Sequence, residues 1–323
     1  MQKSYLQRHT LIMALTMMLA LFMAACAVQP VQPATTEPAT AAETVTVSHP
    51  QGETTVVKNP QRVVVFEYGI LNTMDLLGLP VIAVPQSSPI PAVIDKYTDA
   101  DAYANAGTLF EPDYEKINEL KPDLIVVGGR SSAAYAELAK IAPTLDVTIN
   151  QANFLEDFRH NMTNLGIIFA KEAEIAGALA EIDSAIARVQ EKAATSEKTA
   201  LIVMTIGGEV NAYGPGSRFG IIHDLLGVTP VEGDIEAETH GDAISFEYIL
   251  EKDPDILFII DRDSATGEAT ESAAQIMDNE LIAATTAYAN DALVYLDPGV
   301  WYLANTGLGT VASMIAEVEA ALE

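Results

Sequence analysis

The chain has 323 residues, of which 45 are acidic and 17 are basic, so its formal net charge is −28. Its 49% hydrophobic residues can form one or two large cores, which excludes a disordered chain, and its length favours about two domains. Nucleic acid is excluded as a partner because a polyanion requires a basic surface on the protein, and the single cysteine excludes a disulfide within the chain.

The first 25 residues have the pattern of a secretory signal peptide. Lys3 and Arg8 precede an apolar stretch, 11–25, whose 15 residues are fewer than the ~20 that a transmembrane helix needs. The stretch leads into Met-Ala-Ala-Cys, which resembles a bacterial lipobox, so we expect Cys26 to become the lipidated first residue of the mature protein. Two alternatives remain open, an uncleaved membrane anchor and a structural role for Cys26.

Residues 26–48 are predicted to form a disordered tether that holds the folded body away from a membrane. Pro, Thr, Ala and Gln dominate this segment, and such a composition cannot bury enough apolar surface to fold. Residues 1–25 contain two basic and no acidic residues, so the mature chain has 15 basic and 45 acidic groups and a formal charge of −30.

The remainder is predicted to be an α/β body with two lobes. Apolar runs at 62–69, 80–85 and 122–129 alternate with helical patterns at 74–79 and 113–120, as in buried parallel strands connected by helices. After a mainly helical stretch, 155–195, the pattern resumes with further apolar runs and short helices. We therefore predict an N-terminal lobe (49–165), a linking helix (166–196) and a C-terminal lobe (197–323).

The two halves share one repeated unit. In each half a helix leads to a Pro-Asp turn and an apolar run, and an arginine follows eight residues after the proline: Pro122 to Arg130, and Pro254 to Arg262. Helix-turn-strand units often look alike, but the matched arginines favour a pseudo-symmetric body.

A third arginine, Arg218, follows the apolar run 201–206. Ligands of open α/β sheets bind outside the carboxyl ends of the strands, so these three of the seven arginines are predicted to line the rim of a cleft and to bind an anionic ligand. The alternative for each arginine is a surface ion pair with one of the many acids. His240, Trp301 and Tyr302 also lie in loops near strand ends; a surface histidine and a core aromatic pair are their alternatives.

Several enzyme classes and cofactors are excluded because the chain lacks their sequence motifs. The segment 214–220 (GPGSRFG) has the wrong glycine spacing for a dinucleotide site, and the chain contains no GxSxG, HExxH, CxxC or Walker A motif. The five histidines are scattered, so no zinc cluster is predicted. We expect no catalysed reaction and no intrinsic cofactor.

Five segments together resemble one family: RVVVFEYGILNTMDLLG, KPDLIVVGGR, GPGSRFGIIHDLLG, THGDAISFEYILEKDPDILFIIDR and LDPGVWYLANTGLG. They are similar to the substrate-binding lipoproteins of bacterial ABC importers for ferric catecholate siderophores, of the enterobactin and petrobactin binding type, which are class III periplasmic binding proteins. The resemblance covers residues from about 45 to 323. It implies two Rossmann-like α/β lobes joined by a single long α-helix, with the ligand in the cleft between them.

The resemblance also implies roles for residues. Arg130, Arg218 and Arg262 would face the negatively charged ferric siderophore. His240 and Tyr302 would contact the ligand and would bind Fe(III) directly when the siderophore is tetradentate, because a bis-catecholate leaves two of the six iron sites open. Trp301 is expected beside the ligand.

We therefore expect a monomeric, extracytoplasmic binding protein, lipid-anchored at the cell membrane in the periplasm or at the cell surface. It would capture a ferric siderophore and deliver it to an ABC permease of the inner or cytoplasmic membrane. Glu67 and Glu209 are candidate acids for permease docking. The alternatives are a binding protein for cobalamin, haem or a hydroxamate siderophore, a lipid-anchored hydrolase, and an adhesion or structural lipoprotein.

Overall fold

The computed structural model describes residues 42–233, 235 and 241–323. The predicted signal peptide and Cys26 lie outside these residues. The described chain begins with an antiparallel hairpin of β1 (Thr44–His49) and β2 (Gly52–Val57). The tether predicted for 26–48 therefore extends too far, because the alternating sequence after Thr44 buries Val47 in the core, 3% exposed, as a half-buried strand does.

The first lobe is built on a parallel sheet with the strand order β5-β4-β3-β6-β7. Its strands are β3 (Val63–Val65), β4 (Ala83–Val84), β5 (Ala104–Asn105), β6 (Leu124–Val127) and β7 (Thr144–Asp146). The α-helices of this lobe are α2 (Tyr68–Leu76), α3 (Tyr114–Leu120) and α4 (Tyr135–Leu138), and its 3₁₀ segments are η1 (Ala92–Thr98), η2 (Gly129–Ala134) and η3 (Gln151–Asn153). Every residue of β3 and β6 is buried, as the continuous apolar runs predicted.

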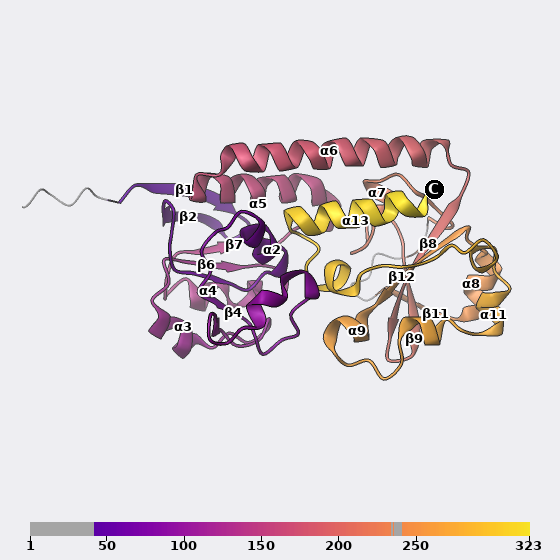
Figure 1. The fold of residues 1–323 in the computed structure, drawn as a ribbon, viewed down its shortest axis with the longest axis horizontal. Coiled ribbons are helices and arrows are strands. Elements are labelled where there is room, and N and C mark those ends of the chain that lie inside the picture. The colour runs from indigo at the N-terminus through magenta and orange to yellow at the C-terminus, as the bar shows by residue number, and fades with distance from the viewer. Residues whose placement is uncertain (1–41, 234, 236–240) are drawn as a thin grey trace, which may run out of the picture. The chain divides into compact units, whose positions relative to one another are not determined.

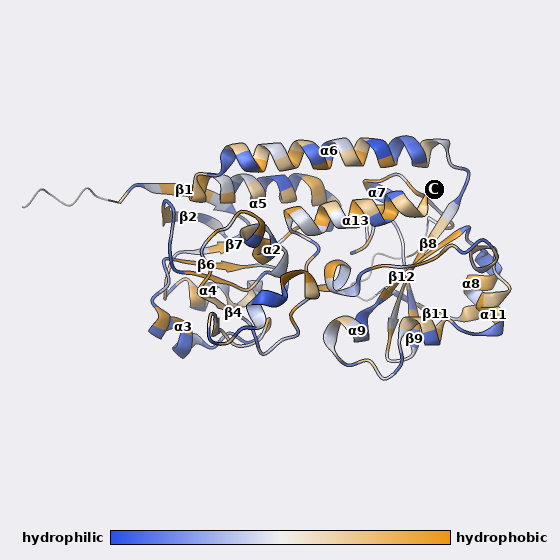
Figure 2. Cartoon of the chain, viewed as in Figure 1, coloured by the Kyte–Doolittle hydropathy of each residue, from blue (hydrophilic) through white to orange (hydrophobic). Residues whose placement is uncertain are grey.

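Two helices lead from the first lobe to the second. The first is α5 (Phe154–Phe169) and the second is α6 (Glu172–Thr195). The predicted linking helix, 166–196, begins too early, because Ala170 adopts a left-handed conformation, with a φ of 52°, and ends α5. The buried side chains of α6, among them Ile182, Ile186 and Val189, recur at helical spacing on one face. Helix α6 packs against α5 and α13 (Figure 1). Hydrophilic and hydrophobic residues alternate along this helix (Figure 2).

The second lobe is built on a mixed sheet with the order β11-β9-β8-β12-β13, and β10 also pairs with β8. Its strands are β8 (Thr199–Ile206), β9 (Glu209–Tyr213), β10 (Thr229–Pro230), β11 (Asp242–Ile244), β12 (Ile256–Asp261) and β13 (Leu293–Tyr295). Its helices are α7 (Ile221–Asp224), α8 (Phe246–Lys252), α9 (Arg262–Thr266), α10 (Ala273–Ile276), α11 (Glu280–Ala283), α12 (Thr286–Ala289), the π-helical turn η4 (Gly299–Leu303) and α13 (Leu308–Ala321).

The strand β9 departs from the predicted parallel arrangement, because it is antiparallel to β8. The turn between the two strands is Gly207-Gly208, with φ of 59° and 84°. Two consecutive positive φ angles match the right-handed twist of a hairpin, and glycine adopts them without strain. The segment after β8 therefore returns along the sheet before the chain reaches Arg218.

The last helix, α13, is held by residues of the first lobe. The backbone N–H groups of Gly309 and Thr310 both donate to Asn72 Oδ1 of α2, at 3.1 and 3.2 Å, and the N–H of Leu308 donates to Thr73 Oγ1 at 2.9 Å. These bonds satisfy the free N–H groups at the start of α13. The C-terminal helix is thus capped by a helix more than 230 positions earlier in the chain, and one apolar core cluster includes residues of both lobes.

Candidate functional site

Tyr302 lies at the centre of a group of cationic side chains. It belongs to the turn η4, which follows β13. Its carbonyl oxygen accepts hydrogen bonds from Nη2 of Arg130, at 2.8 Å, and from Nη2 of Arg218. The guanidinium carbons of these arginines lie 5.0 and 4.3 Å from the centre of its ring. Cation–π contact and hydrogen bonding therefore hold two arginines against one tyrosine.

Arg130 is positioned by the chain that follows β6. Gly129 adopts a positive φ of 50°, and its N–H donates to Thr148 Oγ1 at 2.9 Å. Thr148 Oγ1 in turn donates to Asp146 Oδ1 at 2.6 Å, and Ser132 Oγ donates to Asp146 Oδ2. This network fixes the backbone on both sides of Arg130, so the arginine extends from a rigid turn.

Arg218 is positioned by the turn of residues 214–220. Ser217 Oγ donates to the Gly214 carbonyl at 2.6 Å, and the Gly216 N–H donates to Asp224 Oδ2 at 2.6 Å. Burial lowers the pKa of the Arg218 guanidinium, and the positive charge of Arg130 lowers it further. The protein thus holds two cations close together in a partly buried position, which is unfavourable without an anion.

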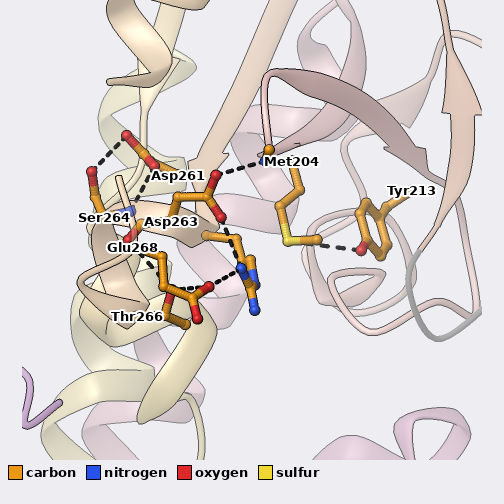
Figure 3. Close-up of polar contacts among 9 residues, drawn as sticks. Met204, Tyr213, Asp261, Asp263, Ser264, Thr266 and Glu268 are labelled. Atoms are coloured by element: carbon orange, nitrogen blue, oxygen red, sulfur yellow. Dashed lines mark hydrogen bonds and ion pairs between the residues drawn. The ribbon is translucent and has the colours of Figure 1, made fainter. Parts of the chain in front are cut away.

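Arg262 is the first residue of α9, directly after β12. Its Nη1 forms ion pairs with Asp263, at 2.9 Å, and with Glu268. Figure 3 shows the carboxylates of Asp263 and Glu268 pointing toward the same guanidinium group. The hydrogen bond with Asp263 is the largest influence on the pKa of Arg262, which is raised. Arg262 therefore lies beside Tyr302 and also forms ion pairs with acids, which was the alternative prediction for each of the three arginines.

The Tyr302 hydroxyl is made more acidic by its surroundings. Burial alone would raise its pKa, but hydrogen bonding to Arg262 and the charges of Arg218 and Arg130 outweigh burial, so the pKa lies below its usual value of 10. A phenol in this setting releases its proton more readily, and a phenolate oxygen is a hard donor suited to Fe(III).

The structure brings four predicted residues together: Arg130, Arg218, Arg262 and Tyr302. Their binding of a ligand stays a prediction. His240 lies outside the described residues.

Trp301 lies in the core, so the expectation that it sits beside the ligand is wrong. Its side chain is 0% exposed, and its Nε1 donates to Glu317 of α13 at 3.1 Å. Burial raises the pKa of Glu317, and the hydrogen bonds from Trp301 and from the Asp297 N–H oppose that rise. Consecutive residues of η4 thus face opposite ways: Trp301 anchors the turn on α13, and Tyr302 faces the arginines.

A cavity of about 670 Å³ adjoins Arg130 and Arg218. A volume of this size is typical of small-molecule sites. Its wall is partly apolar and partly neutral and polar, and the lining residues include Phe66, Glu67, Tyr68, Leu109, Arg130, Val147, Thr148, Asn150, Gln151, Arg218, Leu303, Asn305 and Thr306. Cationic groups thus lie at one part of the cavity, while most of its wall comes from the first lobe.

Sequence analysis missed most of this wall. Thr148 and Asn150 follow β7, whose three residues, Thr-Leu-Asp, contain only one apolar side chain and so give no strand signal in the sequence. Glu67 follows β3 and lines the cavity, so the same strand-end rule that found the arginines could have found it. Glu67 is half-buried in the cavity wall and Glu209 is exposed, and a role in permease docking stays a prediction for both.

Among residues 42–233, 235 and 241–323, no three His, Cys, Asp or Glu side chains are grouped so as to hold a metal ion. No helix in the same part of the chain combines the length and the apolar character needed to cross a membrane.

Comparison with known families decides the architecture. Residues 63–300 match the model described as "Periplasmic binding protein". The chain belongs to this periplasmic binding protein family. The family assignment agrees with the fold expected from sequence, an α/β body whose sheets form two lobes.

Several proteins are similar along most of the chain. Petrobactin-binding protein YclQ of Bacillus subtilis is 42% identical over 87% of this chain and 89% of its own length, and its crystal structure superposes with a TM-score of 0.83. Ferric-anguibactin-binding protein FatB of Vibrio anguillarum is 30% identical over 85% of this chain and 86% of its own. The catecholate-siderophore binding protein VctP of Vibrio cholerae is 37% identical, has a TM-score of 0.80, and matches 86% of this chain and 100% of that one.

Proposed function

We propose that this protein is the substrate-binding component of an ABC importer and that it captures a ferric catecholate siderophore. The observation that carries the proposal is the arginine cluster, Arg130, Arg218 and Arg262, gathered around Tyr302 beside a cavity of about 670 Å³. A locally cationic site in a chain of charge −28 requires an anionic ligand to compensate it. The relatives are named for binding petrobactin, ferric anguibactin and catecholate siderophores, which supports this ligand class.

No reaction is part of this proposal. The protein would bind its cargo, remain a monomer, and pass the ferric complex to a permease in the membrane. Cys26 would carry the lipid anchor after removal of residues 1–25, and residues 27–43 would act as the tether between anchor and body.

Tyr302 is proposed as an iron ligand for tetradentate siderophores. Its lowered pKa favours the phenolate, and a bis-catecholate leaves two iron sites free for protein donors. His240 would be the second donor. A hexadentate tris-catecholate fills all iron sites, so the same residues would only contact that ligand.

Calorimetric titration of the mature protein with three iron complexes tests the proposal. We expect a ferric bis-catecholate and a ferric tris-catecholate to bind at sub-micromolar concentration. A neutral ferric tris-hydroxamate should bind at least roughly 100-fold more weakly, because it leaves the cationic cluster uncompensated. Equal affinity for the hydroxamate, or no heat with either catecholate, would refute the catecholate assignment.

Changing Tyr302 to Phe then separates coordination from contact. We expect the variant to lose much more affinity for the tetradentate complex than for the hexadentate one, together with a change in the visible absorption of the bound tetradentate iron. Equal losses for the two complexes and an unchanged spectrum would refute coordination. Quenching of Trp301 emission is a poor substitute for calorimetry, because this indole is buried in the core.

A further inference from the structure

Glu67 contributes a carboxylate to the cavity that is otherwise lined by neutral and cationic groups. It is the only acidic residue among the described residues that line this cavity. It directly precedes α2, and its Oε2 accepts a hydrogen bond from the N–H of Ile70 at 2.7 Å. A negative charge at this place would repel the anionic ligand of the proposed function, so the carboxylate requires an explanation.

The side chain of Glu67 has little room to move away. A Cβ atom placed on Gly128 would lie only 3.0 Å from Glu67 Cγ and 2.9 Å from Val147 Cγ2, so the stem of Glu67 packs directly on the backbone after β6. On its other side the first turn of α2 meets the segment before α13, where a Cβ on Gly69 would lie 2.6 Å from the Gly307 nitrogen. The contact of the Glu67 stem with the backbone after β6 thus limits rotation of the half-buried side chain away from the cavity.

Few charged or titratable groups face this carboxylate. Arg130 of η2 is the cation that acts on it, and Arg218 of the second lobe lines the same cavity. Tyr68 of α2 is the neighbouring titratable group, and burial raises its pKa, so it stays neutral. Burial raises the pKa of Glu67 above its usual value, while hydrogen bonding to the Ile70 N–H, to the Thr306 side chain and to the Gly69 N–H, and then the charge of Arg130, oppose that rise.

An anionic ligand in the cavity would raise the pKa of Glu67 further. Once the ligand compensates Arg130, Glu67 keeps its hydrogen bond from the Ile70 N–H but loses the influence of that cation and gains a like charge across the cavity. Both changes favour the neutral carboxyl, and a nearby like charge typically shifts a pKa by one unit or more. A protonated carboxyl also becomes a donor and can hydrogen-bond to a ligand oxygen.

We propose that Glu67 couples the capture of an anionic ferric siderophore to the uptake of one proton. This inference rests on the proposed function, because it requires an anionic ligand. The sign follows from linkage: the pKa of Glu67 is higher in the complex than in the free protein, so affinity is greatest below both values. It then falls by up to about tenfold per pH unit as the pH rises between them.

The test counts protons during binding. A ferric tris-catecholate is titrated calorimetrically into the protein at one neutral pH in buffers of different ionisation enthalpy, and the slope of heat against that enthalpy gives the number of protons taken up. The variants are Glu67→Gln, which keeps an acceptor for the Ile70 N–H, and Glu209→Gln, which removes an exposed carboxylate from β9. Protons released or taken up by the ligand itself are common to all three proteins.

We expect the wild type and Glu209→Gln to take up the same number of protons, and Glu67→Gln to take up fewer, by as much as about one. Equal counts in the wild type and Glu67→Gln, with binding intact, would overturn the inference and leave the proposed function standing. No binding by the wild type would overturn both. Should Glu67→Gln fail to fold, the infrared difference spectrum of the wild type decides: binding should produce the carbonyl band of a protonated carboxyl, and its absence would refute proton uptake at Glu67.

Discussion

Replacing Arg218 with Gln is expected to weaken ligand binding strongly while changing stability little. The variant keeps a polar side chain but loses the guanidinium that lies 4.3 Å from the Tyr302 ring. A hydrogen bond to a charged group contributes about 1.5–3 kcal/mol, so the affinity for a ferric catecholate should fall roughly 10- to 150-fold. Arg130 remains as a donor to the Tyr302 carbonyl, so the tyrosine stays anchored.

The stability of the same variant should change by less than about 1 kcal/mol, since two effects oppose each other. The substitution removes one hydrogen bond to Tyr302, but it also removes a partly buried cation whose pKa is lowered by burial and by Arg130. Calorimetry measures the binding loss and urea unfolding measures the stability. Arg159→Gln is the matched control, because Arg159 forms an exposed ion pair with Asp183 and should bind ligand as the wild type does. Equal losses of affinity in the two variants would refute the reasoning.

Two further substitutions test the framework of the site. Asp146→Asn should lower the free energy of unfolding by about 2 kcal/mol at neutral pH, because this buried carboxylate accepts four hydrogen bonds. Burial alone would raise the pKa of Asp146, but the hydrogen bonds outweigh burial and lower the pKa. The stabilisation is therefore present above the unfolded pKa of about 3.9 and is lost as the pH falls through the folded pKa. Urea unfolding at several pH values measures this, with exposed Asp101→Asn as the control, and a stability difference that is constant down to acidic pH would contradict it. Gly307→Ala should destabilise the fold by about 1–3 kcal/mol, because the added Cβ would lie 2.1 Å from the Gly69 carbonyl oxygen. Gly177→Ala is the control, because an added Cβ at this position of α6 meets nothing within 4 Å, and it should stabilise the fold by up to about 1 kcal/mol. Melting temperatures compare the two alanine variants, and similar values would show that the contact at Gly307 can relax.

The sequence allowed the two lobes and the arginine cluster to be predicted because both depend on local patterns. Buried parallel strands give continuous apolar runs, and the end of each run indicates where Arg130 and Arg262 must lie. That Tyr302 lies among them could not be derived in the same way. Its neighbour Trp301 has an equally apolar body, and only the π-helical geometry of η4 decides which ring enters the core.

The cavity wall was less predictable, because its residues come from elements that lack a strong sequence signal. β7 has three residues, and the loop before α13 has no regular pattern. The antiparallel strand β9 was missed for another reason. Its five residues alternate between polar and apolar types only briefly, and the reversal of the chain depends on the Gly207-Gly208 turn, which was not predicted.

The capping of α13 by α2 has a consequence for the order in which the chain can fold. Asn72 and Thr73 are buried, and their partners are the N–H groups of residues 308–310, near the very end of the chain. During synthesis Asn72 Oδ1 lacks these donors until the C-terminus has emerged, whereas Thr73 Oγ1 already donates to the Gly69 carbonyl within α2. A chain that ends before residue 308 would lack these donors and would expose the face of α2 that packs against α13. The N-terminal lobe is therefore completed only when the C-terminal segment is in place, so loss of that segment should destabilise both lobes.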